Sequence, residues 1–409
     1  MNKAEGSVLT PVLQRYSAEA GAELQRILQF WQQQALDEKH GGFVGQMDHN
    51  GIVNQDAPKG GILNARILWT FSAAYRHTTD PQHLQLAERS FEYLLKHFVD
   101  EEWGGIYWEL DAQGKPLKTR KQIYALAFAI YGLSEFYRAT KNERALVLSR
   151  ELYRWIEKHS FDREHGGYFE AFSREGELLD DLRLSPKDRN DPKTMNTHLH
   201  ILEAYANLYR IWPDGQLAQQ LELLIEVFLD RIIDSRTGHM NLFFTAEWKV
   251  TAELVSYGHD IEASWLLQEA AEVLGNGELL QRVKRVAVQM ARATEEGLQP
   301  DGSLYHELDR EEGHYDTHRE WWVSAEAMVG FLNAYQLTGE AKFLEQSLNS
   351  WKFAQKHFLD KEKGEWFWGV YDDYSLMKGE DKIGFWKCPY HNSRACMEVV
   401  HRCKTIMDS

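Results

Sequence analysis

The stretch SYGHDIEASW, residues 256–265, contains side chains that could carry out acid–base chemistry at the start of a predicted helix. His259 and Glu262 are three residues apart, so a helix turning about 100° per residue would place both on one face. Trp265 follows three residues later and could form an aromatic wall beside them. Polar residues at a helix start often only cap it, and for this stretch alone that reading stays open.

The elements that would position these residues recur along the chain. A glycine-containing run of alternating aromatic and polar residues returns six times, at spacings of 63, 62, 72, 64 and 62 residues. The runs are marked by Gly41, Gly104, Gly166, Gly238, Gly302 and Gly364. A chain of 409 residues exceeds one ordinary compact core, and so regular a period indicates an internal repeat.

Each unit has an amphipathic segment before its glycine run, a hairpin-like run, and a more apolar segment after it. The segments 84–100 and 342–360 have the helical period and charged faces of half-solvated outer helices. The apolar segments, which should be buried inner helices, are 62–76, 123–138, 196–210 and 321–336. Together they predict an all-α fold, an (α/α)6 barrel of twelve helices formed by residues 1–409 as a single domain. An open solenoid is the alternative, but its terminal repeats should be polar, and the last unit is strongly aromatic.

Superposing the predicted inner helices reveals a polar layer within an apolar background. The helices align on Tyr75, Tyr137, Tyr209 and Tyr335. The residues nine positions earlier are Arg66, Phe128, His200 and Glu326, and aligning Gly275 with Gly339 adds Glu262 to this row. The residues thirteen positions earlier are Ile62, Tyr124, Asn196 and Trp322. Burying so many polar groups is costly without partners, so the layer predicts a pocket, with a buried structural network as the alternative.

The residue types in this layer suit proton transfer on a sugar. Histidine exchanges protons near neutral pH, and two histidines on opposite walls could act on the two faces of one carbon. Arginine and asparagine can polarise a carbonyl or hold hydroxyl groups, and aromatic planes suit the apolar faces of sugar rings.

Composition and motifs exclude several other classes of function. A net charge of −16 disfavours nucleic acid and anionic membranes as partners. No apolar run approaches the roughly 18 residues of a membrane span, and no apolar signal core begins the chain, so we expect a cytoplasmic protein. The three cysteines, Cys388, Cys396 and Cys403, fit reduced, buried thiols better than a disulfide framework.

Metal and nucleotide motifs are also absent from the sequence. His198 and His200 form an HxH pair, but on a helix they would lie about 200° apart and could not share one ion. No HExxH motif, phosphate-binding glycine loop or GxSxG element is present, so we expect neither a metal nor another cofactor.

Five motifs together resemble the cellobiose 2-epimerases of the N-acylglucosamine 2-epimerase superfamily. They are GILNARILWTF, MNTHLHILEAYANLYR, SYGHDIEASWLL, EWWVSAEAMVGFLNAYQ and FWKCPYHNSRACMEV. The resemblance covers about residues 20 to 405. It implies an (α/α)6 barrel that interconverts glucose and mannose at the reducing end of β-1,4-linked disaccharides, without metal or nucleotide.

The resemblance also implies a role for each matching residue. His259 and His391 match the general acid–base pair, and Glu262 and Glu326 match carboxylates important for activity. The remaining matches contact the substrate or otherwise support activity, and are Arg66, Tyr124, Asn196, His200, Trp265, Trp322 and Trp386. His391 and Trp386 rest mainly on the resemblance, because the repeat alignment does not place the last helix in register.

Three other functions remain as alternatives. An aldose–ketose isomerase, such as a mannose isomerase, would use the same enediol and return the proton to C1. An inverting glycoside hydrolase would need two separated carboxyl groups, for which Glu262, Glu326 and the loop acids Asp180, Asp181 and Asp188 are candidates. A non-catalytic binding toroid would bind sugar or protein without turnover. The heavily charged outer helices favour a monomer.

Overall fold

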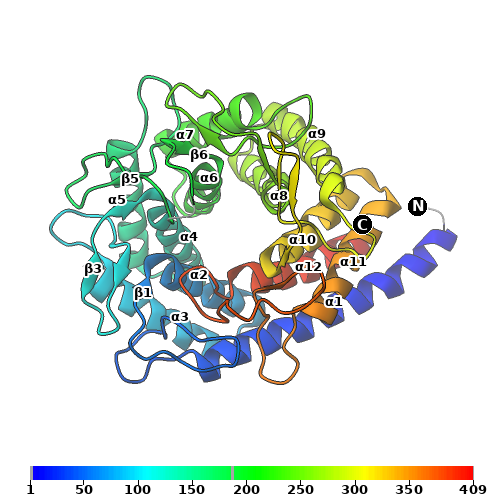
Figure 1. Cartoon of the computed structure of the whole chain (residues 1–409), viewed down its shortest axis with the longest axis horizontal. Helices are drawn as coiled ribbons and strands as arrows, with labels where there is room; N and C mark the ends of the chain where they lie inside the picture. The colour runs from blue at the N-terminus through cyan, green and yellow to red at the C-terminus, as the bar shows by residue number, and fades with distance from the viewer. Residues whose placement is uncertain (1–2, 186–187, 409) are drawn as a thin grey trace.

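The helices form two concentric rings in the computed structural model, which describes residues 3–185 and 188–408 (Figure 1). The inner ring consists of α2 (Gly61–Thr78), α4 (Ile123–Thr140), α6 (Met195–Tyr209), α8 (Tyr257–Leu274), α10 (Trp321–Thr338) and α12 (Tyr390–Asp408). The outer ring consists of α1 (Lys3–Gln34), α3 (Pro81–Tyr93), α5 (Glu143–His159), α7 (Gly215–Val227), α9 (Gly277–Thr294) and α11 (Ala341–His357). A π-helical turn extends α3 over Leu94–Phe98 and another extends α7 over Phe228–Ile232, while a 3-10 turn, Glu295–Gly297, follows α9.

The ring is closed. The last inner helix, α12, packs against both α10 and α2, and α1 packs along α12. The predicted (α/α)6 barrel is therefore confirmed, and the open solenoid is wrong.

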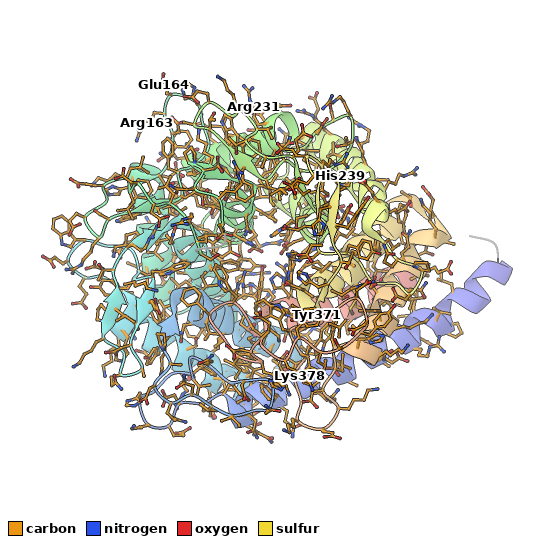
Figure 2. All side chains as sticks on the ribbon, viewed as in Figure 1. Arg163, Glu164, Arg231, His239, Tyr371 and Lys378 are labelled. Carbon is orange, nitrogen blue, oxygen red and sulfur yellow. The ribbon has the colours of Figure 1, made fainter. Side chains whose placement is uncertain are left out.

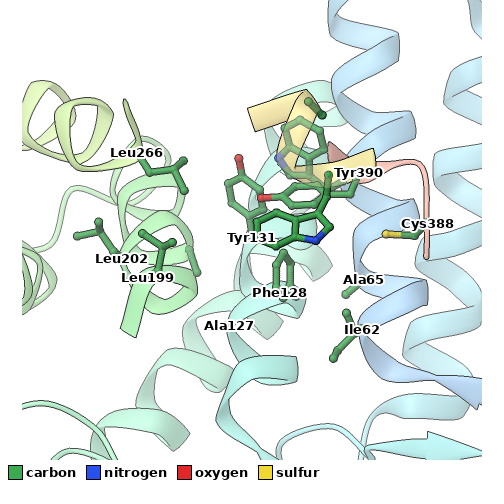
Figure 3. Close-up of a cluster of buried hydrophobic side chains, with 14 of the residues drawn as sticks. Ile62, Ala65, Ala127, Phe128, Tyr131, Leu199, Leu202, Leu266, Cys388 and Tyr390 are labelled. Carbon is green, nitrogen blue, oxygen red and sulfur yellow. The ribbon is translucent and has the colours of Figure 1, made fainter. Parts of the chain in front are cut away.

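The inner helices are buried because they are made of alanine, aromatic and aliphatic residues. In α4 every residue from Ile123 to Phe136 is buried. Gly132 lets two inner helices approach, since a Cβ there would lie 2.6 Å from the carbonyl oxygen of Ala65 in α2. Towards the centre of the barrel, Phe128 and Tyr131 lie beside Tyr390 at the start of α12 (Figure 3).

The outer helices are amphipathic, and polar caps mark where several of them begin. Asp80, Asn142, Asp214 and Asn276 each accept a hydrogen bond from a backbone N–H in the first turn of α3, α5, α7 and α9. Their charged faces point to solvent, and Arg163, Glu164 and Arg231 lie at the outer edge of the molecule (Figure 2). Among the described helices none is long and apolar enough to span a membrane.

The strands are short and connect successive repeat units. They are β1 (Lys59–Gly60), β2 (Glu109–Leu110), β3 (Pro116–Lys118), β4 (Lys121–Gln122), β5 (Ala171–Phe172), β6 (Lys193–Thr194), β7 (Phe243–Phe244), β8 (Leu254–Ser256), β9 (Glu307–Asp309), β10 (His314–Asp316), β11 (Arg319–Glu320) and β12 (Gly369–Val370). The predicted hairpins are present as β2–β3 and β9–β10. The strand before an inner helix, however, pairs with the glycine run of the next unit, as in β1–β2, β4–β5, β6–β7, β8–β9 and β11–β12. A bridge between Met47 and Ile383 joins the last unit to the first.

Four buried lysine–aspartate pairs hold the glycine runs against the inner ring. The pairs are Lys59–Asp37, Lys121–Asp100, Lys193–Asp162 and Lys382–Asp360. In the third, Lys193 Nζ lies 2.6 Å from Asp162 Oδ2 and also donates to the carbonyl oxygen of Gly166 at 2.8 Å. Each lysine thus neutralises a buried carboxylate, and Lys59, Lys193 and Lys382 each also donate to the carbonyl oxygen of a turn glycine. All three cysteines are free and buried, as predicted.

Candidate active site

The predicted polar layer lies near the N-terminal ends of the inner helices. Arg66, Phe128, His200, Glu262 and Glu326 are each the sixth residue of their helix, from α2 to α10 in order. The alignment on the shared tyrosines, and on Gly275 and Gly339 for Glu262, therefore places these residues at one level of the barrel, as predicted.

A second row lies one turn closer to the helix starts. Tyr124, Asn196 and Trp322 are the second residues of α4, α6 and α10. His391 is the second residue of α12, so the structure supplies the register that the sequence alignment lacked. His259 is the third residue of α8.

His391 is held by a carboxylate on the neighbouring helix. Its Nδ1 lies 2.7 Å from Glu326 Oε1 and 3.9 Å from Glu262 Oε1. An ionised carboxylate can only accept, so Nδ1 carries the hydrogen and Nε2 keeps a lone pair free for a proton. Glu326 is therefore the carboxylate that orients His391, whereas Glu262 lies too far from the same nitrogen for a hydrogen bond.

His259 approaches the same tryptophan as His391. Its ring centroid lies 4.7 Å from that of Trp322, and the His391 centroid lies 5.7 Å from it. His259 Nδ1 is 2.8 Å from the hydroxyl oxygen of Ser256. A hydroxyl can donate or accept, so this partner permits either tautomer of His259.

Arg394 connects the acidic residues beneath His391, and the sequence analysis did not identify it. Its Nη2 donates to Glu262 Oε1 and Glu326 Oε1, both at 2.6 Å, and its Nη1 donates to Glu203 Oε2 at 2.9 Å. Tyr390 Oη donates to the same oxygen of Glu203 at 2.6 Å. One buried guanidinium thereby bridges three carboxyl groups, and its single positive charge is shared among them.

Glu203 also positions His200 and was likewise missed. The distance from His200 Nδ1 to Glu203 Oε1 is 2.7 Å, so the Nε2 of this histidine is left free. The sequence could have predicted this contact, because His200 and Glu203 are three residues apart, as His259 and Glu262 are, and residues at that spacing lie on one helical face.

Arg66 occupies the wall formed by the first two inner helices. Its Nη2 donates to Tyr124 Oη at 2.8 Å, and its guanidinium lies 4.1 Å from the ring centroid of Phe128. Its Nη1 reaches the backbone carbonyl of Trp386 at 3.4 Å, and the Trp386 ring packs edge-on to Tyr124 with centroids 5.9 Å apart. The Nε of Arg66 is buried without a hydrogen-bond partner.

A cavity of about 200 Å³ opens at this end of the barrel. Asn196 and His259 line it together with Glu307, Asp188 and Arg189. The amide oxygen of Asn196 is buried without a protein partner, so it is available to a ligand.

Trp265 lies on the other side of the carboxylates and does not line the cavity that His259 lines. Its Nε1 donates to Glu326 Oε2 at 3.0 Å. It faces a second cavity, of about 720 Å³, at the C-terminal ends of the inner helices, whose mouth carries paired charges such as Arg76 with Glu135 and Arg210 with Glu269. The predicted wall beside His259 is formed by Trp322, while Trp265 supports Glu326 from behind.

Burial keeps both proposed acid–base histidines neutral. It lowers the pKa of His259 to about 3, and the nearby imidazole of His200 acts in the same direction. It also lowers the pKa of His391 to about 3, although Glu326 opposes this shift. Burial raises the pKa of Glu262, and repulsion from Glu326 adds to the rise. The pKa of Glu326 is instead lowered to about 2, because the effects of Arg394 and His391 together outweigh that of burial.

Donor atoms of Glu262, Glu326 and His391 lie within 4.8 Å of one another, which is close enough for metal ligands. The guanidinium of Arg394, however, already contacts both carboxylates, so the positive charge between them is supplied by the chain.

His198 of the HxH pair is buried apart from His200: its Nε2 accepts from the backbone N–H of Tyr168 at 2.9 Å and its Nδ1 faces the carbonyl of Thr194 at 2.6 Å.

The two carboxylates also lie too close for an inverting glycosidase. Such enzymes separate their carboxyl groups by roughly 6.5–9.5 Å to admit a water molecule. Glu262 and Glu326 instead share one nitrogen of Arg394. Of the loop acids, Asp188 lines the cavity near His259, whereas the Asp181 carboxylate is exposed and paired with Arg183.

Known proteins share this architecture and much of this sequence. Residues 41–395 match the N-acylglucosamine 2-epimerase (GlcNAc 2-epimerase) family. The cellobiose 2-epimerase of Bacteroides fragilis is 49% identical over 375 residues, which cover 92% of this chain and 96% of the relative. The solved cellobiose 2-epimerase of Bacillus thermoamylovorans B4167 is 40% identical, covers 95% of this chain and 100% of its own, and superposes with a TM-score of 0.91.

The D-mannose isomerase of Marinomonas mediterranea is more distant, at 22% identity over 401 residues that cover 93% of this chain and 95% of the relative. The family match, the identity over nearly the whole length and the superposition agree with one another. The chain belongs to the N-acylglucosamine 2-epimerase family and, within it, to the cellobiose 2-epimerases.

Proposed function

We propose that the protein epimerises C2 of the reducing-end glucose in β-1,4-linked disaccharides, converting cellobiose to glucosyl-mannose and lactose to epilactose. The observation that carries the proposal is the pair of buried, neutral histidines, His259 and His391, which come from different inner helices and contact the same tryptophan, Trp322. Inverting C2 requires removing the proton α to the open-chain aldehyde and returning one to the opposite face. A single base would tend to restore the original isomer, so two bases are needed.

His391 is the base best prepared for one face. Glu326 accepts its Nδ1–H, leaving Nε2 to take the C2 proton and stabilising the imidazolium that forms. His259 serves the other face, and Ser256 can follow its change of protonation by rotating its hydroxyl. The negative charge of an enediolate between the rings would raise the pKa of both histidines, so each can hold a proton during turnover.

Arg66 supports the charge that develops on the sugar. Its guanidinium is fixed by Tyr124 and Phe128, and its orphaned Nε is a free donor. A preorganised donor aimed at such an oxygen contributes about 3 kcal/mol in comparable sites. The N-terminal ends of the inner helices add positive potential at the same level. Asn196 and His200 would hold hydroxyl groups, and Trp322 and Trp386 would contact the sugar faces.

We propose that this chemistry needs no metal or other cofactor, because Arg394 supplies the fixed positive charge and the histidines move the protons. We also propose a single catalytic domain acting as a cytoplasmic monomer. The charged outer helices support the monomer, and the three free cysteines support a reducing compartment. Sedimentation analysis tests the oligomeric state.

Proton NMR of cellobiose incubated in D2O with EDTA-treated protein tests the proposal. We expect the mannose-end disaccharide, with deuterium at C2. A ketose as the main product would instead identify an isomerase, and free glucose would identify a hydrolase. An unchanged spectrum with cellobiose and with lactose would refute the proposed activity.

A further inference from the structure

A second group of ionisable side chains lies outside the catalytic layer, where a hairpin approaches the start of α10. β9 and β10 pair antiparallel, with Glu307 opposite Asp316. The backbone N–H of His306 donates to the carbonyl oxygen of Asp316 at 3.0 Å, which brings His306 beside His318. The two imidazole rings stack with centroids 4.5 Å apart, and the carboxylate of Glu320 lies next to both.

The donor atoms of this cluster are close enough to share an ion. Atoms of His306, His318 and Glu320 lie within 4.8 Å of one another. His318 Nε2 is 3.1 Å from Glu320 Oε1, and His306 Nδ1 is 3.9 Å from Glu320 Oε2. The second distance is too long for a hydrogen bond, and this Nδ1 is shielded from solvent without any other partner. An ion bound at about 2.0–2.2 Å from nitrogen and from oxygen would fill such a gap.

The surroundings hold these groups in place. His318 Nδ1 is hydrogen-bonded to Asp316 Oδ1, so its Nε2 is directed towards Glu320. A carboxylate on the outer nitrogen is the arrangement that orients metal-binding histidines. Glu320 is fixed in turn by the indole N–H groups of Trp322, at 2.6 Å, and Trp368, at 3.0 Å.

We propose that His306, His318 and Glu320 form a binding site for one divalent transition-metal ion, for which Zn²⁺ is the appropriate probe. Two imidazoles and one carboxylate are a donor set of open zinc sites, whereas Ca²⁺ and Mg²⁺ prefer oxygen ligands alone. The inference goes beyond the proposed function, whose proton transfers use other residues. Because Trp322 donates to Glu320, the bound ion lies against the wall of the sugar pocket.

Calorimetric titration of the EDTA-treated, full-length protein with ZnCl2 tests this site, and the visible absorption of bound Co²⁺ reports the ligand environment. The variants are His306→Ala and His318→Ala, with His314→Ala as the matched control, because His314 is an exposed histidine of the same hairpin. Circular dichroism confirms that each variant is folded.

We expect at least tenfold weaker Zn²⁺ binding in both site variants, together with a changed Co²⁺ spectrum, and unchanged affinity in His314→Ala. Asp316→Asn should weaken binding about 10–100-fold, because it removes the group that orients His318. Equal affinity in the wild type and both site variants, no binding to the wild type, or an equal loss in His314→Ala would each overturn the proposal.

Discussion

Replacing Glu326 by glutamine tests how the carboxylate acts through His391. The change keeps the size of the side chain but removes the charge that lies 2.7 Å from His391 Nδ1. The imidazolium formed during proton abstraction then loses a charge-assisted hydrogen bond worth about 1.5–3 kcal/mol. An amide can also donate to Nδ1 and leave the wrong tautomer, an effect that costs about 10⁴-fold in serine proteases. We therefore expect kcat for cellobiose epimerisation to fall about 10²- to 10⁴-fold.

Glu262→Gln is the matched control, because Glu262 accepts from the same Arg394 nitrogen as Glu326 but lies 3.9 Å from His391 Nδ1, too far for a hydrogen bond. Its kcat should exceed that of Glu326→Gln by at least tenfold. Initial rates followed by NMR, with thermal unfolding to confirm that both variants fold, provide the comparison. Equal losses in the two variants, or a Glu326→Gln enzyme within threefold of the wild type, would refute the proposed orienting role.

Three further predictions concern stability and pH dependence. Lys193→Met leaves the buried Asp162 without its cation and should lower the free energy of unfolding by about 3 kcal/mol in urea titrations, whereas exposed Lys249→Met should change it little. Burial lowers the pKa of His198 to about 4, so its contribution to stability is complete above about pH 6.5 and is lost as the pH falls towards 4. His198→Gln should therefore remove about 3 kcal/mol of the stability difference between pH 7 and pH 4, and an unchanged pH dependence would contradict this. Arg394→Gln removes a positive charge that lowers the pKa of His391, so the acid limb of the kcat/KM profile should move to higher pH, and a limb that stays in place would argue against electrostatic control by Arg394.

The ring and its polar layer could be predicted because both leave a periodic signal. The glycine runs recur at nearly constant spacing, and polar residues at one helical level contrast with alanine and leucine around them. This contrast brings Arg66, His200, Glu262 and Glu326 into one row from the sequence alone. Polar residues on otherwise apolar helices predict a pocket, because buried polar groups are costly unless they have partners.

Other features leave no such signal. Arg394 was missed because α12 lacks both the terminal tyrosine and the following glycine that aligned the other inner helices. Trp265 was expected beside His259, but spacing along one helix does not say which cavity a side chain faces. The strands of two or three residues are too short for an alternating pattern, so their pairing between successive units could not be foreseen.

Exchange of the C2 hydrogen, measured separately for each epimer in D2O, tests the two-histidine mechanism most directly. We expect His259→Asn and His391→Asn to abolish epimerisation while each retains deuterium exchange into only one epimer, cellobiose for one variant and glucosyl-mannose for the other. This outcome would assign one face of C2 to each histidine. Exchange into both epimers by either variant would mean that a single base serves both faces, and the central claim would be wrong.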